Sequence, residues 1–160
     1  MEEIAAAAGV ARQTVYAHFP TRDALLGAVI DRVTGQVLAA IEEADLDTGP
    51  AGAALRRWLD VSWGLLARYP VLLQPAVMAA SPSIEHERHL PIMETLLRLI
   101  QRGQRSGEFD RGQSPTWLVA ATVALGHAAG QEVSEGRLSA HDAGAAFRDS
   151  VLRIYLATAP

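Results

Sequence analysis

The chain has 160 residues, a formal net charge of −4 and a hydrophobic content of 49%. This length suits one compact unit, or a small head on a larger body, and the composition indicates a folded protein. Cysteine is absent, which excludes a disulfide scaffold and thiolate chemistry. Because the charge balance is mildly acidic, nucleic-acid binding cannot be argued from net charge.

The sequence predicts an all-α fold, because alanine and leucine are abundant and alternating strand patterns are hard to find. The N-terminus lacks the basic start and apolar core of a secretory signal. The longest apolar stretch, 117–130, is interrupted by His127 and is shorter than a bilayer requires. We therefore expect a soluble, cytoplasmic protein that has no membrane partner.

The first 26 residues predict two short helices joined by a tight turn. The first helix should cover 2–8 and stop at Gly9, a residue that tolerates the left-handed turn conformation. The second should cover 12–18, with Val10 plugging the turn into the core, and it should end before Pro20. Such a pair is the arrangement that places a recognition helix in the DNA major groove.

A long helix should follow, N-capped by Thr21 and running from residue 22 to about residue 44. The segment 44–50 is rich in Asp, Thr, Gly and Pro and is the best linker candidate. Further helices are predicted over 51–69, 71–80, 91–106, 115–135 and 140–157. We expect a helix-turn-helix head with its connecting helix over 1–45, and a helical ligand-binding and dimerisation bundle over 46–160.

The second short helix divides its residues between two roles. Gln and Arg side chains reach base edges, and Ala or the Thr methyl can contact a thymine methyl. The apolar anchors are Val10, Val15 and Phe19. The exposed candidates for contact with DNA are Arg12, Gln13, Thr14, Ala17 and His18.

The motif resembles the tetracycline-repressor (TetR) family of transcriptional regulators. The residues that carry the resemblance are Ile4-Ala5-x-x-Ala8-Gly9-Val10, then Thr14-Val15-Tyr16-x-His18-Phe19, then Arg22-x-x-Leu25. The resemblance implies a homodimeric, ligand-responsive regulator, most often a repressor, that binds a palindromic double-stranded operator. It implies phosphate contacts from Tyr16, His18 and Arg22. In the family a further helix precedes the residue that matches Ile4, so we expect this head to be truncated.

The last two predicted helices carry stripes that suit a four-helix dimer interface, because small side chains let helices approach closely. The alternative, a plain monomer core, has the same periodicity. The interface candidates are Trp117, Ala120, Ala121, Ala124 and Ala128 on one helix, and Phe147, Val151 and Ile154 on the other.

Aromatic, methionine and histidine residues of the body could line a cavity for a small apolar or amphipathic effector. Core filling or surface exposure is the competing explanation for most of them, Tyr69, Met78, His86 and His89 included. The ligand-binding candidates are Trp63, Met93 and His127, followed by Trp58 and Trp117.

Nothing in the sequence predicts catalysis. His86 and His89 share a helix face but lack a third ligand, so we expect no metal site and no cofactor. No nucleophile–base pair, phosphate loop or paired-carboxylate site is seen, so we expect no enzyme. The alternative function is a helical small-molecule-binding and dimerisation module whose truncated head no longer binds DNA.

Overall fold

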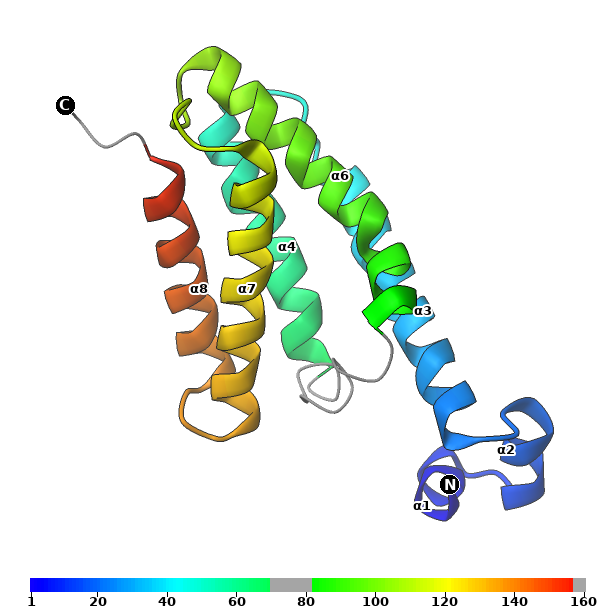
Figure 1. The fold of residues 1–160 in the computed structure, drawn as a ribbon. Helices are drawn as coiled ribbons and strands as arrows, with labels where there is room; N and C mark the ends of the chain where they lie inside the picture. The colour runs from blue at the N-terminus through cyan, green and yellow to red at the C-terminus, as the bar shows by residue number, and fades with distance from the viewer. Residues whose placement is uncertain (70–81, 157–160) are drawn as a thin grey trace. The chain divides into compact units, whose positions relative to one another are not determined.

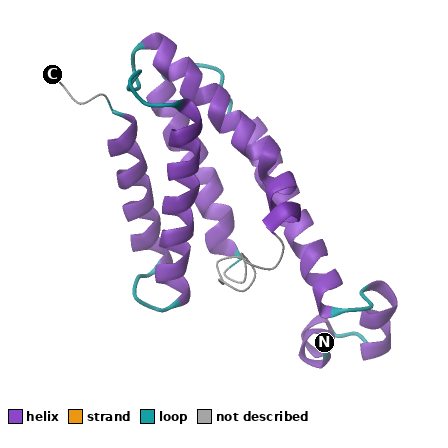
Figure 2. Cartoon of the chain, in the orientation of Figure 1, coloured by secondary structure: helices purple, strands orange, loops and turns teal. Residues whose placement is uncertain are grey.

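The structure is a computed structural model that describes residues 1–69 and 82–156. Every regular element in these ranges is an α-helix, which confirms the all-α fold class (Figures 1 and 2). The helices are α1 (Glu2–Ala8), α2 (Arg12–His18), α3 (Arg22–Glu43), α4 (Ala51–Arg68), α6 (Pro82–Ser106), α7 (Pro115–Ser134) and α8 (Ala140–Tyr155).

The chain forms two compact units, Met1–Gly35 and Gln36–Pro160, and α3 continues from the first into the second. The predicted domain boundary after residue 45 stays a prediction. The short predicted helix over 71–80, with Met78, lies outside the described residues.

The first unit is built around the turn at Gly9. Gly9 has φ +66°, and its N–H donates to the Ala6 carbonyl at 3.2 Å. The Val10 N–H donates to the Ala5 carbonyl at 3.0 Å, which completes a Schellman motif. The prediction that Gly9 ends the first helix is confirmed. The prediction that Val10 plugs into the core is wrong, since Val10 is 43% exposed and the two short helices bury Ala5 and Val15 instead.

Helix α3 begins as predicted, because the Thr21 hydroxyl oxygen accepts a hydrogen bond from the Ala24 N–H at 3.0 Å. Its residues Val33, Val37 and Ile41, one turn apart, are all buried. By length and composition alone, α3 could cross a membrane, unlike the shorter stretch singled out in the sequence. Asp31 and Arg32 lie in its middle and are exposed, which is costly inside a bilayer.

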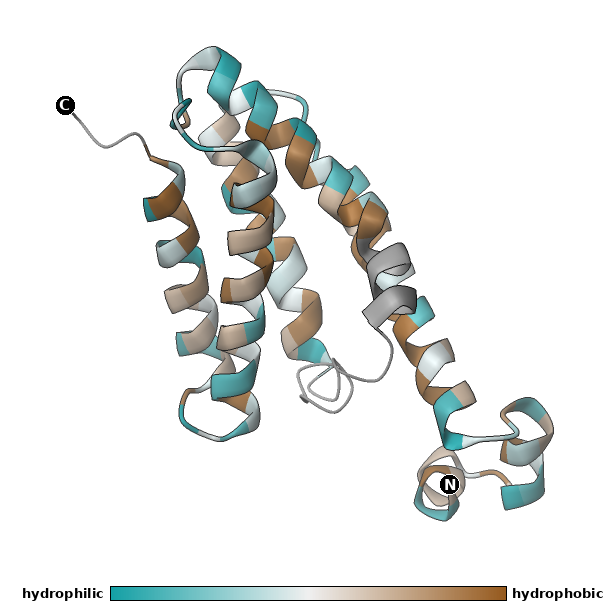
Figure 3. Cartoon of the chain, in the orientation of Figure 1, coloured by the Kyte–Doolittle hydropathy of each residue, from teal (hydrophilic) through white to brown (hydrophobic). Residues whose placement is uncertain are grey.

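The second unit is a helical bundle. Helix α7 packs along α8, α4 packs against α6 and α8, and α6 packs on α7 (Figure 1). Apolar residues recur along the helices of the bundle (Figure 3). The largest fully buried apolar side chains are Leu55, Leu59, Leu96, Ile100, Leu118 and Val151.

A buried pair of hydroxyl groups links α7 and α8. The Thr122 hydroxyl donates to the Leu118 carbonyl at 2.8 Å and lies 2.9 Å from the Tyr155 hydroxyl. Burial raises the pKa of Tyr155 well above its ordinary value, against the opposing effect of the Thr122 hydrogen bond. The Tyr155 ring also meets Phe109 edge-on, with centroids 5.2 Å apart.

Two glycines, Gly103 and Gly107, shape the turn after α6. Gly107 has φ +82°, a conformation that favours glycine. A Cβ on Gly103 would lie 2.1 Å from the Phe109 ring, so Gly103 makes room for that ring. Between them, the Glu108 carboxylate accepts the Gly52 N–H at 3.0 Å and caps the start of α4. Hydrogen bonds from the Gly52 and Ala51 N–H groups lower the pKa of Glu108.

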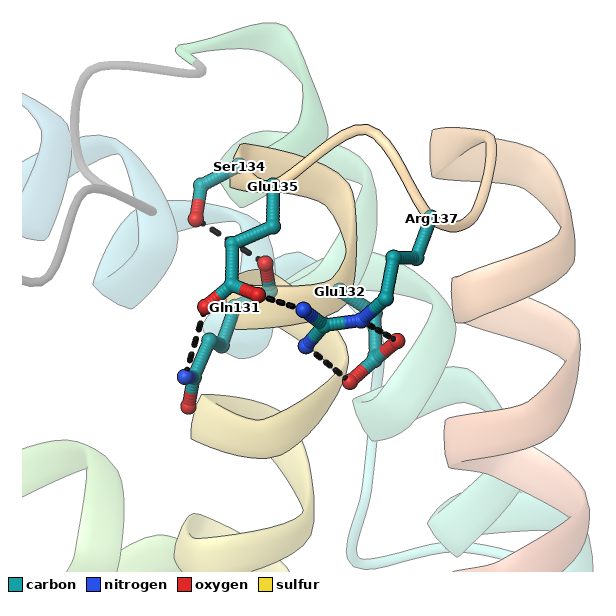
Figure 4. A network of polar contacts seen from close by, with 5 residues as sticks. All are labelled: Gln131, Glu132, Ser134, Glu135 and Arg137. Atoms are coloured by element: carbon teal, nitrogen blue, oxygen red, sulfur yellow. Dashed lines mark hydrogen bonds and ion pairs between the residues drawn. The ribbon is translucent and has the colours of Figure 1, made fainter.

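The turn between α7 and α8 is held by an exposed polar network (Figure 4). Arg137 donates two hydrogen bonds of 2.6 Å to the Glu132 carboxylate and forms an ion pair with Glu135. The bonds from Arg137 lower the pKa of Glu132. Helix α8 then begins at a true N-cap, because the Ser139 hydroxyl oxygen accepts the Asp142 N–H at 3.1 Å.

One helix start differs from its prediction. Helix α6 begins at Pro82 rather than at Pro91, which lies inside the helix. Proline is favoured at the first position of a helix because its missing N–H would have no partner there. Pro91 removes one backbone donor, yet the helix continues, and the Thr95 hydroxyl donates to the Pro91 carbonyl at 3.0 Å.

Candidate nucleic-acid interface

The two faces of α2 are separated as the motif predicts. Val15, on one face, is buried, as is Ala5 of α1. The other face is solvent-exposed and carries Gln13, Thr14, Ala17 and His18. Polar groups that can read base edges are therefore held on a helix whose opposite side is anchored.

Arg12, at the start of α2, is engaged within the first unit. It forms an ion pair with Glu2 of α1, and its guanidinium lies 5.3 Å from the centre of the Tyr16 ring. The Tyr16 hydrogen bond and the Glu2 charge both raise the pKa of Arg12. The Glu2 and Arg12 side chains remain largely exposed, so the pair can open at little cost. This pairing could not be predicted from local sequence patterns, because it depends on how α1 and α2 meet.

Arg22 is exposed at the first position of α3. The positive end of a helix and its first N–H groups suit a phosphate oxygen. The adjacent Asp23 is negatively charged and would repel a phosphate. The positive charge at this helix start therefore comes from Arg22. Tyr16 is 38% exposed, and its ring is partly covered by Arg12.

The predicted effector residues are dispersed. Trp63 is buried, its indole N–H donates to the Ala140 carbonyl at 3.0 Å, and its ring lies 5.8 Å from that of Phe147. Trp58 is buried on the same helix, Met93 is half-buried, and His127 is exposed. Trp117 is 62% exposed. The side chains of His86 and His89 lie outside the described residues, although their backbone belongs to α6.

The described part of the second unit has at least two surface clefts. One, of about 500 Å³, is lined by Gln101, Gln104, Arg105 and Arg111. The other, of about 320 Å³, lies between the end of α3 and α6. None of the five predicted effector residues lines either cleft, so their role stays a prediction.

The predicted dimer residues divide into an exposed and a buried set. Trp117, Ala120, Ala124 and Ala128 form an exposed stripe along α7. Ala121 and Ile154 are half-buried. Phe147 and Val151 are buried within the single chain.

The comparisons with known proteins agree with this geometry. The family model described as "Bacterial regulatory proteins, tetR family" matches residues 1–29. The HTH-type transcriptional repressor LfrR of Mycolicibacterium smegmatis is 42% identical over 81 residues, which cover 48% of this chain and 41% of that protein. The matched stretch thus spans less than half of this curated relative.

Solved structures extend the likeness to nearly the whole chain. LfrR from Mycobacterium smegmatis in complex with proflavine has a TM-score of 0.70 at 29% identity, covering 98% of this chain and 85% of that one. A tetR-family regulatory protein from Rhodococcus RHA1 has a TM-score of 0.77 at 22% identity, covering 99% and 86% respectively. The first 29 residues thus match the TetR family of bacterial regulatory proteins, and the chain has the fold of TetR-family structures.

Proposed function

We propose that this chain is a DNA-binding transcriptional regulator that acts as a repressor, and not an enzyme. The observation that carries the proposal is the exposed face of α2, anchored from behind by Ala5 and Val15. The match of the regulatory-protein family to residues 1–29 covers the same segment. LfrR is named as a repressor, which supports repression, and not activation, as the activity of this chain. A DNA-binding role puts the protein in the cytoplasm.

The side chains in and beside α2 would make two kinds of contact with DNA, to bases and to phosphates. Gln13 is suited to a bidentate contact with adenine, and the methyl groups of Thr14 and Ala17 to contact with thymine. Tyr16, His18 and Arg22 would contact phosphates and fix the register of the helix on the duplex. Arg12 would join them after leaving Glu2, exchanging one exposed carboxylate for a phosphate oxygen.

The regulator would act as a homodimer on a palindromic operator. A two-fold dimer presents two recognition helices to half-sites about 34–36 Å apart. The exposed stripe Trp117, Ala120, Ala124 and Ala128 of α7 supports this, because its small residues permit close helix packing and Trp117 adds a large apolar surface. Ala121 and Ile154 would lie at its edge, with Phe147 and Val151 beneath.

A small apolar or amphipathic molecule would regulate the protein by binding the second unit, where Trp58, Trp63, Met93, Trp117 and His127 are the candidate contacts. LfrR has been solved with proflavine, which makes proflavine the first effector to test. The effector would favour a conformation whose recognition helices no longer match successive major grooves. Because α3 belongs to both units, it would carry the change.

The test begins with selection of duplexes from a randomised library by the full chain, followed by fluorescence anisotropy on the selected sequence. We expect a palindromic site, bound with strong salt dependence, and weaker binding when proflavine is present. The variant Gln13→Ala should lose preference for the selected bases, whereas Gln131→Ala, a glutamine of α7, should not. Failure to enrich any sequence would contradict the proposal and favour the alternative, a small-molecule-binding and dimerisation module.

A further inference from the structure

The turn that follows α3 has a composition typical of a flexible linker, but hydrogen bonds hold its backbone in place. Residues 44–49 include Asp45 at φ +47° and Gly49 at φ +68°. Leu46, in the middle of the turn, is buried. Backbone carbonyls in such a turn ordinarily face water, and here five of them accept hydrogen bonds from arginine.

Two arginines from different helices supply these bonds. Arg57 of α4 donates from Nε to the Ala44 carbonyl at 2.9 Å and from a terminal nitrogen to the Asp45 carbonyl at 2.8 Å. Arg102 of α6 donates to the carbonyls of Leu46 at 2.7 Å, and of Asp47 and Gly49 at 2.9 Å each. We call this set the arginine clamp.

The clamp joins three helices at one place. Arg57 holds the first two residues after α3 to α4, while Arg102 holds the rest of the turn to α6. On the other side of the junction, Glu108 accepts the Gly52 N–H at the start of α4. The end of α3 is thereby tied to the two helices that pack against each other in the second unit.

We propose that Arg57 and Arg102 are positioning residues that make the end of α3 move with α4 and α6 as one body. A displacement of α6 is then passed to α3 instead of being absorbed in the turn. The proposal rests on the proposed function only for its consequence, the effect on DNA binding. The mechanical part concerns residues 36–160 alone.

The role depends on the shape of the guanidinium group as well as on its charge. Arginine presents five N–H donors in a rigid plane and can reach several carbonyls at once, whereas the lysine ammonium acts as a compact point charge. Arg57→Lys and Arg102→Lys therefore keep the charge and remove most of the bonds. Arg105→Lys, an exposed arginine on α6 outside the clamp, is the matched control.

Because the chain has no cysteine, the full-length protein can be spin-labelled at two introduced positions. We choose the exposed residues Ala39 of α3 and Asp149 of α8, as Ala39→Cys and Asp149→Cys. The distance distribution should be narrow in the parent and in Arg105→Lys. It should broaden or gain a second distance in Arg102→Lys, and more so in the double clamp variant. A reference pair on α7 and α8, Thr116→Cys and Asp149→Cys, should stay narrow throughout.

A clamp variant that lowers the melting temperature yet keeps the Ala39–Asp149 distribution as narrow as in the parent would overturn the proposal, because the arginines would then serve stability alone. In the anisotropy assay, the double variant should bind proflavine like the parent but lose most of the change in DNA affinity that proflavine causes. An unchanged response would also overturn it. A parent chain that binds no DNA would refute the proposed function, while the spin-label result would still decide the mechanical claim.

Discussion

Arg12 of α2 and Glu2 of α1 form an ion pair across the Gly9 turn, so the Glu2 carboxylate neutralises a positive charge that the proposed interface would otherwise offer to a phosphate. Both side chains are more than half exposed. An acidic group in this position opposes the approach of any polyanion.

Replacing Glu2 should therefore strengthen DNA binding. For Glu2→Gln we expect about two- to five-fold higher affinity at low salt, the range of an exposed ion pair, with a smaller gain at high salt. Fluorescence anisotropy on the selected operator and on an unrelated duplex measures it, and both should gain equally. Glu3→Gln removes an equal charge one residue away. If Glu3→Gln has the same effect, net charge and not the Arg12 pair is responsible.

Base reading and phosphate contact should separate between Gln13 and Arg22. Gln13→Ala should cost about 1–3 kcal/mol at one base-pair position and leave binding to unrelated DNA unchanged. Arg22→Gln should weaken binding to all sequences and reduce the slope of log affinity against log salt by about one. Competition binding over a salt series distinguishes the two patterns. Interchanged patterns would reverse the assignment of the two residues.

Trp63 lies so close to Gly144 of α8 that a Cβ there would be 2.3 Å from the indole nitrogen. Since that nitrogen also donates to the Ala140 carbonyl, the ring cannot retreat freely. We expect Gly144→Ala to destabilise the protein by about 1–3 kcal/mol, seen in denaturant unfolding. Gly64→Ala, where a Cβ meets nothing within 4 Å, should instead stabilise it by about 0.5–1 kcal/mol. Equal effects at the two glycines would contradict this packing.

The buried Tyr155 hydroxyl should make stability depend on alkaline pH. Because burial raises its pKa in the folded protein, the folded state keeps the proton while the unfolded chain loses it. Stability from this residue is complete below the ordinary tyrosine pKa of about 10 and falls as the pH rises above it. Tyr155→Phe should cost about 1 kcal/mol at neutral pH through the lost hydrogen bond. It should also show a shallower alkaline decline in melting temperature than the parent.

The local features of this fold were accessible from the sequence, and the long-range ones were not. Gly9 was predicted to stop a helix, and its φ is positive, because a helix end depends on the residues beside it. Pro91 misled the prediction of α6, since the cost of an internal proline was outweighed by the rest of a long helix. In this chain, proline therefore predicts helix boundaries less well than glycine does.

The candidate site shows the same division. The exposed and anchored faces of α2 follow from helical spacing alone. By contrast, Trp63 fills the space above Gly144, and Arg102 binds a turn more than fifty residues earlier in the chain. No local pattern encodes either contact, because each depends on which helices become neighbours. Likewise, Phe147 and Val151 have a periodicity that fits an interface or a core, and they are buried within the single chain.

The exposed stripe of α7 gives the last prediction. Ala124 lies at its centre and is exposed in the protomer, so Ala124→Glu should leave folding intact while placing a carboxylate in the proposed dimer interface. In a two-fold interface the same surface occurs on both subunits, so the substitution introduces two like charges at once. We expect the dimer to dissociate at micromolar concentration, measured by sedimentation, with an unchanged melting profile for the monomer. Ala39→Glu, an exposed alanine on α3, is the control and should remain dimeric. If Ala124→Glu remains as dimeric as this control, α7 does not form the interface.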